Sequence, residues 1–203
     1  FERAYSALLS FGISLRDEGL EVPVLDLGGG IGVDYQNGTP TDFTAYGKLV
    51  SRLFAGSSFQ LGFEPGRSIV ANNGVLLTRV IYVKDGDNKR FVIVDAGMND
   101  LLRPTLYEAH HNIRPVGREG AIEGLADIVG PVCETGDYLG LDKMMPSLAA
   151  SDCLAVMSAG AYGAVMSSTY NSRPLIPEVL VDQARFHIIR PRMSYAEMLA
   201  RDS

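Results

Sequence analysis

A thiol and a carboxylate stand side by side in Cys133-Glu134, inside the glycine-flanked string GPVCETGD at residues 130–137. A cysteine can transfer a proton, and a neighbouring carboxylate can hold an ammonium group of a substrate. A structural turn has no need of this pair, although a buried structural cysteine is common in proteins. The pair is therefore a candidate for proton transfer at a site that binds an amine.

Two glycine-containing strings offer groups for an anion. Gly28-Gly29-Gly30-Ile31-Gly32 follows an apolar run, so its backbone N–H groups could approach a phosphate without obstruction by side chains. Glu64-Pro65-Gly66-Arg67 follows another apolar run, and its Gly66 N–H and Arg67 guanidinium could share the same phosphate. The alternatives are a flexible turn at a strand end and a turn with a surface ion pair.

Two further positions could contact a substrate. Arg103 and Tyr107 lie four residues apart in RPTLY, so on one helical turn they would face the same way and could hold a carboxylate. Tyr162 stands among small residues in GAYGA at residues 160–164, where its hydroxyl could reach a phosphate or a substrate. A solvated arginine packed on a tyrosine, and a core tyrosine among small residues, are the alternative interpretations.

The elements that position the two glycine strings alternate between helix and strand. Apolar spacing predicts a helix over residues 1–19, a buried strand over 22–27, a helix over 43–54 begun by Thr41 or Asp42, and a strand over 59–63. This alternation is typical of a parallel α/β fold. In α/β barrels the active site forms at the carboxyl ends of the strands, which is where both glycine strings stand.

The pattern after Arg67 changes to short β-rich runs. Runs at 75–83 and 91–95 flank Asp85-Gly86-Asp87-Asn88, which predicts a hairpin turn. Other strands are expected at 126–129, 153–158, 178–182 and 186–189, and a short helix at 195–201. We predict that residues 1–67 form an α/β part and that residues 68–203 form a mostly antiparallel β domain, a sandwich or a barrel.

Composition excludes several classes of protein. Of the 203 residues, 46% are hydrophobic and 21% charged, which is ordinary for a globular protein. A net charge of −6 and the lack of a basic run argue against a nucleic-acid surface, and no apolar stretch approaches the roughly 20 residues of a membrane helix. Two cysteines give no disulfide framework, so we expect a cytoplasmic protein. The three histidines have no metal-ligand spacing, so no metal site is expected.

Five strings, taken in order, resemble the second half of a fold-type III decarboxylase that uses pyridoxal 5'-phosphate (PLP). This family includes the diaminopimelate, ornithine and arginine decarboxylases. RPTLY is more similar to the diaminopimelate branch than to the ornithine branch. One such string would be unspecific, whereas five in the family's order are highly specific. The strings are LDLGGGIGVDY (25–35), FEPGRSIVANNG (63–74), VDAGMNDLLRPTLYEAHH (94–111), GPVCETGD (130–137) and GAYGAVMSSTYNSRP (160–174).

The resemblance implies a cofactor site. Gly28, Gly29 and Gly30, with the backbone around Pro65 and Gly66, would cradle the PLP phosphate. Glu64 and Arg67 belong to the same cofactor-facing motif, and Tyr162 would lie beside both phosphate and substrate.

The resemblance also implies a substrate and a reaction, the decarboxylation of meso-2,6-diaminopimelate to L-lysine and CO2. Arg67, Arg103 and Tyr107 would hold the distal carboxylate of this substrate, and Glu134 its distal ammonium. Cys133 would donate the proton that replaces CO2. Cys133 and Glu134 would reach the neighbouring subunit's site, which implies a homodimer with shared active sites.

The resemblance further implies that residues 1–67 are the last βα units of a (β/α)8 barrel, which needs about 250 residues when whole. The family's Schiff-base lysine has no counterpart, because all four lysines stand in unrelated contexts. We therefore expect a longer enzyme and an inactive isolated chain. The alternatives are a decarboxylase of another diamino acid, of ornithine, arginine or carboxynorspermidine type, and a truncated, non-catalytic homologue that serves dimerisation or regulation.

Overall fold

The structure is a computed structural model that describes residues 1–87, 89–117 and 120–201. Residue contacts divide the described chain into two compact units, residues 1–34 with 39–69 and residues 35–38 with 70–203. Each unit has a hydrophobic core of its own. The short segment 35–38 therefore packs with the second unit, although its neighbours in sequence belong to the first.

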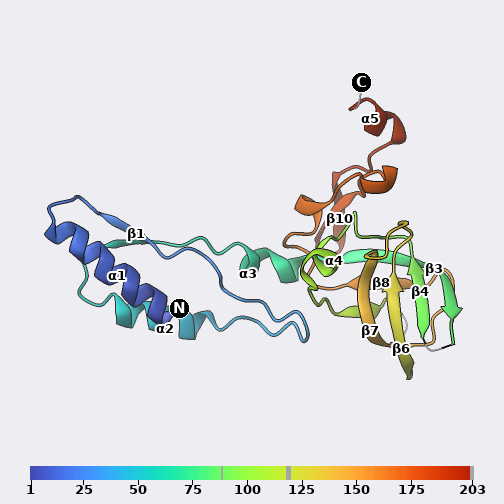
Figure 1. Cartoon of the computed structure of the whole chain (residues 1–203), viewed down its shortest axis with the longest axis horizontal. Helices are drawn as coiled ribbons and strands as arrows, with labels where there is room; N and C mark the ends of the chain where they lie inside the picture. The colour runs from blue at the N-terminus through green and yellow to red at the C-terminus, as the bar shows by residue number, and fades with distance from the viewer. Residues whose placement is uncertain (88, 118–119, 202–203) are drawn as a thin grey trace. The chain divides into compact units, whose positions relative to one another are not determined.

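The first unit consists of two helices and two parallel strands (Figure 1). Its core is formed by Tyr5, Leu25, Leu27, Val50 and Phe54. The parallel pairing confirms the predicted alternation of helix and strand. The elements are α1 (Glu2–Asp17), β1 (Val24–Asp26), α2 (Phe43–Leu53) and β2 (Gln60–Gly62), and α3 (Arg67–Val70) follows at the boundary between the units.

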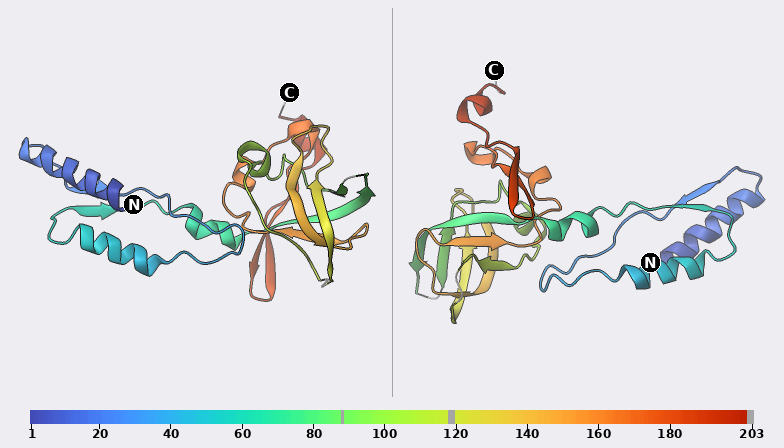
Figure 2. Two further views of the ribbon diagram at one scale, coloured as in Figure 1. Left: turned by 60° about the horizontal axis from the view of Figure 1, so that its bottom comes forward. Right: turned by 180° about the vertical axis from the view of Figure 1, so that it is seen from behind.

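Local sequence explains where the second helix begins and how the two helices pack. The Asp42 side chain caps α2 by accepting a hydrogen bond of 2.8 Å from the backbone N–H of Ala45. The hydroxyls of Tyr5 on α1 and Tyr46 on α2 are 2.9 Å apart, so a polar contact joins the two helices. Figure 2 shows these helices beside the β1–β2 pair.

The second unit is built on a six-stranded sheet that is nearly closed. The strands lie in the order β5-β8-β3-β4-β6-β7, and every neighbouring pair except β4–β6 is antiparallel. The two margins approach each other, because Lys143 Nζ on β7 donates to the carbonyl of His111, 2.9 Å away, just before β5. This confirms the predicted, mostly antiparallel, barrel-like β domain. The strands are β3 (Leu76–Asp85), β4 (Arg90–Val94), β5 (Ile113–Pro115), β6 (Ile122–Val129), β7 (Tyr138–Pro146) and β8 (Cys153–Val156).

The parallel β4–β6 pair arises from a crossover connection, as parallel neighbours require. After β4 the chain forms the single-turn helix α4 (Arg103–Tyr107) and then strand β5. This strand pairs with β8 at the margin of the sheet opposite β7. It returns as β6 beside β4 (Figure 1). The crossover therefore carries the RPTLY string across the end of the sheet.

The predicted hairpin is present, with Asp85 paired with Arg90 and Gly86 N–H donating to Lys89 at 2.9 Å. Asn88 of the predicted turn lies outside the described residues. Strands β5 and β7 were not predicted. Register shifts interrupt the β6–β7 pairing, and Asp142 on β7 has a φ of 51°. Burial along β7 therefore does not alternate, and no period-two pattern marks this strand in the sequence.

The last part of the chain forms a separate two-stranded antiparallel sheet, β9 (Glu178–Asp182) and β10 (Arg185–Arg190), followed by α5 (Tyr195–Leu199). Both strands and the helix were predicted. Ser194 and Glu197 form a capping box that begins α5.

Candidate functional site

The two glycine strings lie side by side in the first unit. Leu27 N–H donates to Gly62, and Glu64 N–H donates to Gly28, each at 2.9 Å. A Cβ atom at Gly29 would lie 2.4 Å from the Glu64 carbonyl oxygen, so only glycine permits this approach. The structure therefore brings together two strings that the sequence predicted to share a ligand.

The residues around these strings fit a phosphate group. A Cβ atom at Gly28, Gly30 or Gly66 would meet no atom within 4 Å, so open space lies beside this backbone. Gly28 and Gly30 have φ values of 66° and 79°, a backbone conformation that residues with a side chain rarely adopt. Exposed Arg67, the last residue of the second string, begins α3 and supplies a positive charge. The Gly28 N–H already donates to Asp26 Oδ1 at 2.7 Å, so other backbone N–H groups of the two strings would have to cradle an anion.

In the second unit, Arg103 and Tyr107 stand in different environments. Arg103 is 7% exposed, whereas Tyr107 is 62% exposed. Arg103 Nη1 lies 3.0 Å from His111 Nε2, and its guanidinium carbon lies 4.5 Å from the centre of the Tyr35 ring. Both residues lie on the single-turn helix α4, Arg103 at its first position and Tyr107 at its last. The predicted role of the pair in binding a carboxylate stays a prediction.

The loop that carries Cys133 and Glu134 is held from inside by Asp137. The carboxylate of Asp137 is buried and accepts hydrogen bonds of 2.6 Å from the backbone N–H groups of Met98 and Val132. Burial raises the pKa of Asp137 above its usual range. Cys133 is exposed and forms no disulfide, so the alternative of a buried structural cysteine is wrong.

Three segments of the second unit converge around this loop. The Tyr138 hydroxyl donates to Pro104 on α4 at 3.1 Å, and the Tyr170 hydroxyl donates to Glu134 at 3.4 Å. Tyr162 is 44% exposed, so it is not the core tyrosine of the alternative interpretation. The strings at 94–111, 130–137 and 160–174 thus meet in one region.

A hydrogen-bond network that was not predicted from the sequence joins the first and last of these strings. Arg173 donates from Nε to Asn99 at 2.9 Å and from Nη2 to the carbonyl of Asp95 at 2.6 Å. Asp100, which is buried, lies 3.6 Å from the same Nη2. Burial raises the pKa of Asp100. The adjacent Asn99-Asp100 pair after Gly97 is the signal that could have marked these residues.

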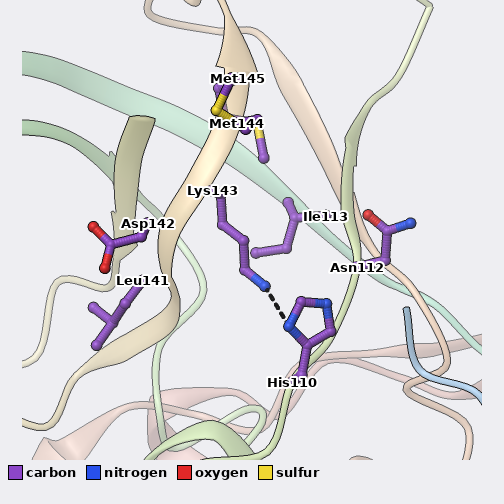
Figure 3. A pocket seen from close by; sticks show the side chains of 8 residues that line it. All are labelled: His110, Asn112, Ile113, Leu141, Asp142, Lys143, Met144 and Met145. Atoms are coloured by element: carbon purple, nitrogen blue, oxygen red, sulfur yellow. Dashed lines mark hydrogen bonds between the residues drawn. The ribbon is translucent and has the colours of Figure 1, made fainter. Parts of the chain in front are cut away.

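A pocket of about 360 Å³ lies beside β7 (Figure 3). Lys143 Nζ donates to His110 Nδ1 within it at 3.1 Å, and burial lowers the pKa of this lysine. No residue predicted from the sequence as a site residue lines the pocket. It is lined by His110, Asn112, Ile113, Leu141, Asp142, Lys143, Met144 and Met145.

Two other kinds of site are absent from the described ranges. No group of three or more His, Cys, Asp or Glu residues there could hold a metal ion. No helix among the same residues is long and apolar enough to span a membrane.

Comparison with known proteins assigns the chain to a family. The family described as pyridoxal-dependent decarboxylase, C-terminal sheet domain, matches residues 10–160. The chain belongs to this family. Its members include the diaminopimelate decarboxylase of Zymomonas mobilis, which is 46% identical over 201 residues that cover 98% of this chain and 48% of that protein. The diaminopimelate decarboxylase of Pseudomonas aeruginosa is 47% identical over 203 residues, 100% of this chain and 49% of that protein.

Solved structures of PLP-dependent decarboxylases agree with this assignment. The crystal structure of Helicobacter pylori diaminopimelate decarboxylase complexed with L-lysine matches with a TM-score of 0.91 and 40% sequence identity. The match covers 99% of this chain and 50% of that one. The chain therefore spans about half the length of the decarboxylases that it matches.

Proposed function

We propose that the chain is the C-terminal half of an enzyme that removes CO2 from meso-2,6-diaminopimelate and releases L-lysine. The observation that carries this proposal is the similarity to proteins named diaminopimelate decarboxylase, 46% and 47% identical over 98% and 100% of the chain. A structural relative of the same name is complexed with L-lysine, which would be the product of this reaction.

The proposed cofactor is PLP. Gly28, Gly29 and Gly30, with residues 64–67, would hold its phosphate. The open space beside Gly28, Gly30 and Gly66 supports this assignment. Tyr162 is the proposed contact from the second unit. When bound, PLP supplies an electron sink for the charge left behind as CO2 departs.

The chain's own residues would orient the substrate and supply the proton. Arg67, Arg103 and Tyr107 would bind the carboxylate that is retained in L-lysine, and Glu134 the ammonium beside it. Cys133 would donate the proton from Sγ to the carbon atom that has lost CO2, and its exposed position on a firmly held loop supports this role.

The proposal includes the arrangement of the longer enzyme. Residues 1–67 would be the last βα units of a (β/α)8 barrel, and residues 68–203 the β domain with the substrate and dimer residues. Two observations support this: β1 and β2 are only two strands, and Phe11, Phe43 and Phe63 of the first unit are exposed. The lysine that holds PLP, a homodimer with shared sites and a cytoplasmic location are parts of the same proposal, as is the inactivity of the isolated chain.

Steady-state decarboxylation by the longer enzyme tests the substrate. We expect CO2 release from meso-diaminopimelate at a kcat/KM at least about a hundredfold above that for L-ornithine, L-arginine or L-lysine, because a site with buried polar partners rejects substrates that leave them unpaired. Preferred turnover of another diamino acid would contradict the assignment. Inactivity towards all of them, with inhibition of a related decarboxylase by heterodimer formation, would favour a regulatory homologue.

A further inference from the structure

Arg103 is held more tightly than the other side chains proposed to contact the substrate. It is 7% exposed, whereas Tyr107, Glu134 and Arg67 are all exposed. One nitrogen, Nη1, is 3.0 Å from His111 Nε2, and the guanidinium carbon lies 4.5 Å from the centre of the Tyr35 ring. Contacts along one edge and on one face restrict the orientation of a planar guanidinium.

His111 has its tautomer fixed by the backbone. Its Nδ1 lies 2.9 Å from the carbonyl oxygen of Met157, and because a carbonyl only accepts, Nδ1 carries the hydrogen. Nε2 is then the acceptor for Arg103 Nη1. The ring is fully buried, and burial lowers the pKa of His111 to about 4, so the neutral form persists at neutral pH.

Tyr35 completes the arrangement. Its ring meets the ring of His111 edge-on, with centroids 5.1 Å apart, while it also lies against Arg103. Tyr35 is 68 positions from Arg103 in the sequence, but both belong to the second unit. The three side chains therefore form one contiguous cluster.

The cluster leaves donors of Arg103 unused. Within the described part of the chain, Nε and Nη2 of Arg103 donate to no residue. Neither atom is among the buried side-chain nitrogens that lack a partner, so both stay open to a ligand. The Nε–Nη2 edge has the fork geometry that a carboxylate accepts from with both oxygens.

We propose that His111 and Tyr35 are positioning residues that fix the Arg103 guanidinium and keep its Nε and Nη2 available to the carboxylate that the product retains. This inference rests on the proposed function, in which Arg103 contacts that carboxylate. His111 and Tyr35 then contribute to selectivity for ligands that carry a distal carboxylate, without touching the ligand themselves.

The test compares two ligands of the full-length PLP-loaded enzyme. L-lysine has the carboxylate in question, and cadaverine is the same diamine without it. Dissociation constants come from the change in cofactor absorbance on titration. His111→Leu removes the acceptor for Arg103, so we expect L-lysine to bind about tenfold more weakly and cadaverine to change less than about twofold.

Two variants make this result specific. His111→Gln restores an acceptor beside Arg103 and is expected to recover most of the affinity for L-lysine. His110→Leu is the matched control, because His110 contacts Lys143 in the pocket of Figure 3 and not Arg103. It is expected to leave the ratio of the two dissociation constants unchanged.

The outcomes separate this inference from the proposed function. Equal weakening of both ligands by His111→Leu, or no weakening, overturns the positioning role. If His111→Leu does not fold, Tyr35→Leu decides in the same way, since it removes the face on which the guanidinium rests. A wild-type enzyme that does not decarboxylate meso-diaminopimelate contradicts the proposed function whatever the variants show.

Discussion

At the residue scale, two buried polar side chains of the second unit are held by partners on the backbone. His111 donates to Met157, and Asp137 accepts from Met98 and Val132. A buried polar group without partners costs free energy, so each of these pairs fixes a loop to the sheet. The loop with the exposed Cys133 and Glu134 is held by the buried residue Asp137, and Glu134 also accepts from the Tyr170 hydroxyl.

The pKa of His111 predicts a dependence of stability on pH. Burial lowers it from an ordinary 6.5 to about 4 in the folded protein. The unfolded chain therefore takes up a proton first, and the stability present above pH 6.5 is lost as the pH falls through 4. We expect the free energy of unfolding to fall by about 2 kcal/mol more between pH 7 and pH 5 than in His111→Gln. Urea denaturation at both pH values measures this, and parallel pH profiles would contradict it.

Replacement of Asp137 tests how the Cys133 loop is held. Asp137→Ala leaves the N–H groups of Met98 and Val132 without their acceptor, so we expect a loss of about 2–4 kcal/mol in the free energy of unfolding. Asp182 is exposed on β9, and Asp182→Ala should change stability by less than about 0.5 kcal/mol. Denaturant-induced unfolding measures the free energy of unfolding of both variants. Equal values for Asp137→Ala and Asp182→Ala would show that Asp137 does not hold the loop.

At the element scale, the parts of the fold that the sequence predicts are those with local patterns. Apolar spacing located α1 and α2, and short apolar runs that lead into the glycine strings located β1 and β2. The β5 and β7 strands escaped because β5 is three residues long and β7 contains register shifts. The Arg103–His111–Tyr35 cluster escaped for another reason: no local pattern joins residues 35 and 103, which are far apart in the sequence.

The close approach of the two glycine strings predicts a difference between two similar substitutions. Gly29→Ala would place a Cβ atom 2.4 Å from the Glu64 carbonyl and force the strings apart, so we expect PLP affinity of the longer enzyme to fall at least about tenfold. Gly32→Ala has no atom within 4 Å of its Cβ position and should change PLP affinity less than about twofold. Equilibrium PLP titration measures both, and equal affinities would show that the approach does not shape the cofactor site.

At the scale of the whole molecule, the chain corresponds to about half of the decarboxylases that it matches. The first unit has a small core and exposed aromatic residues, while the second has an extensive core of its own. A two-stranded parallel sheet buries little on its own, so the first unit is expected to depend on further strands for its stability. The proposed lysine that holds PLP would come with them.

The most direct test of the central claim is the intact mass of the protein after borohydride reduction in the presence of PLP. We predict a mass well above the 21.9 kDa of this chain, with the cofactor trapped on a lysine outside residues 1–203. A mass of 21.9 kDa with PLP trapped on Lys48, Lys84, Lys89 or Lys143 would contradict it. So would a longer protein in which no PLP is trapped.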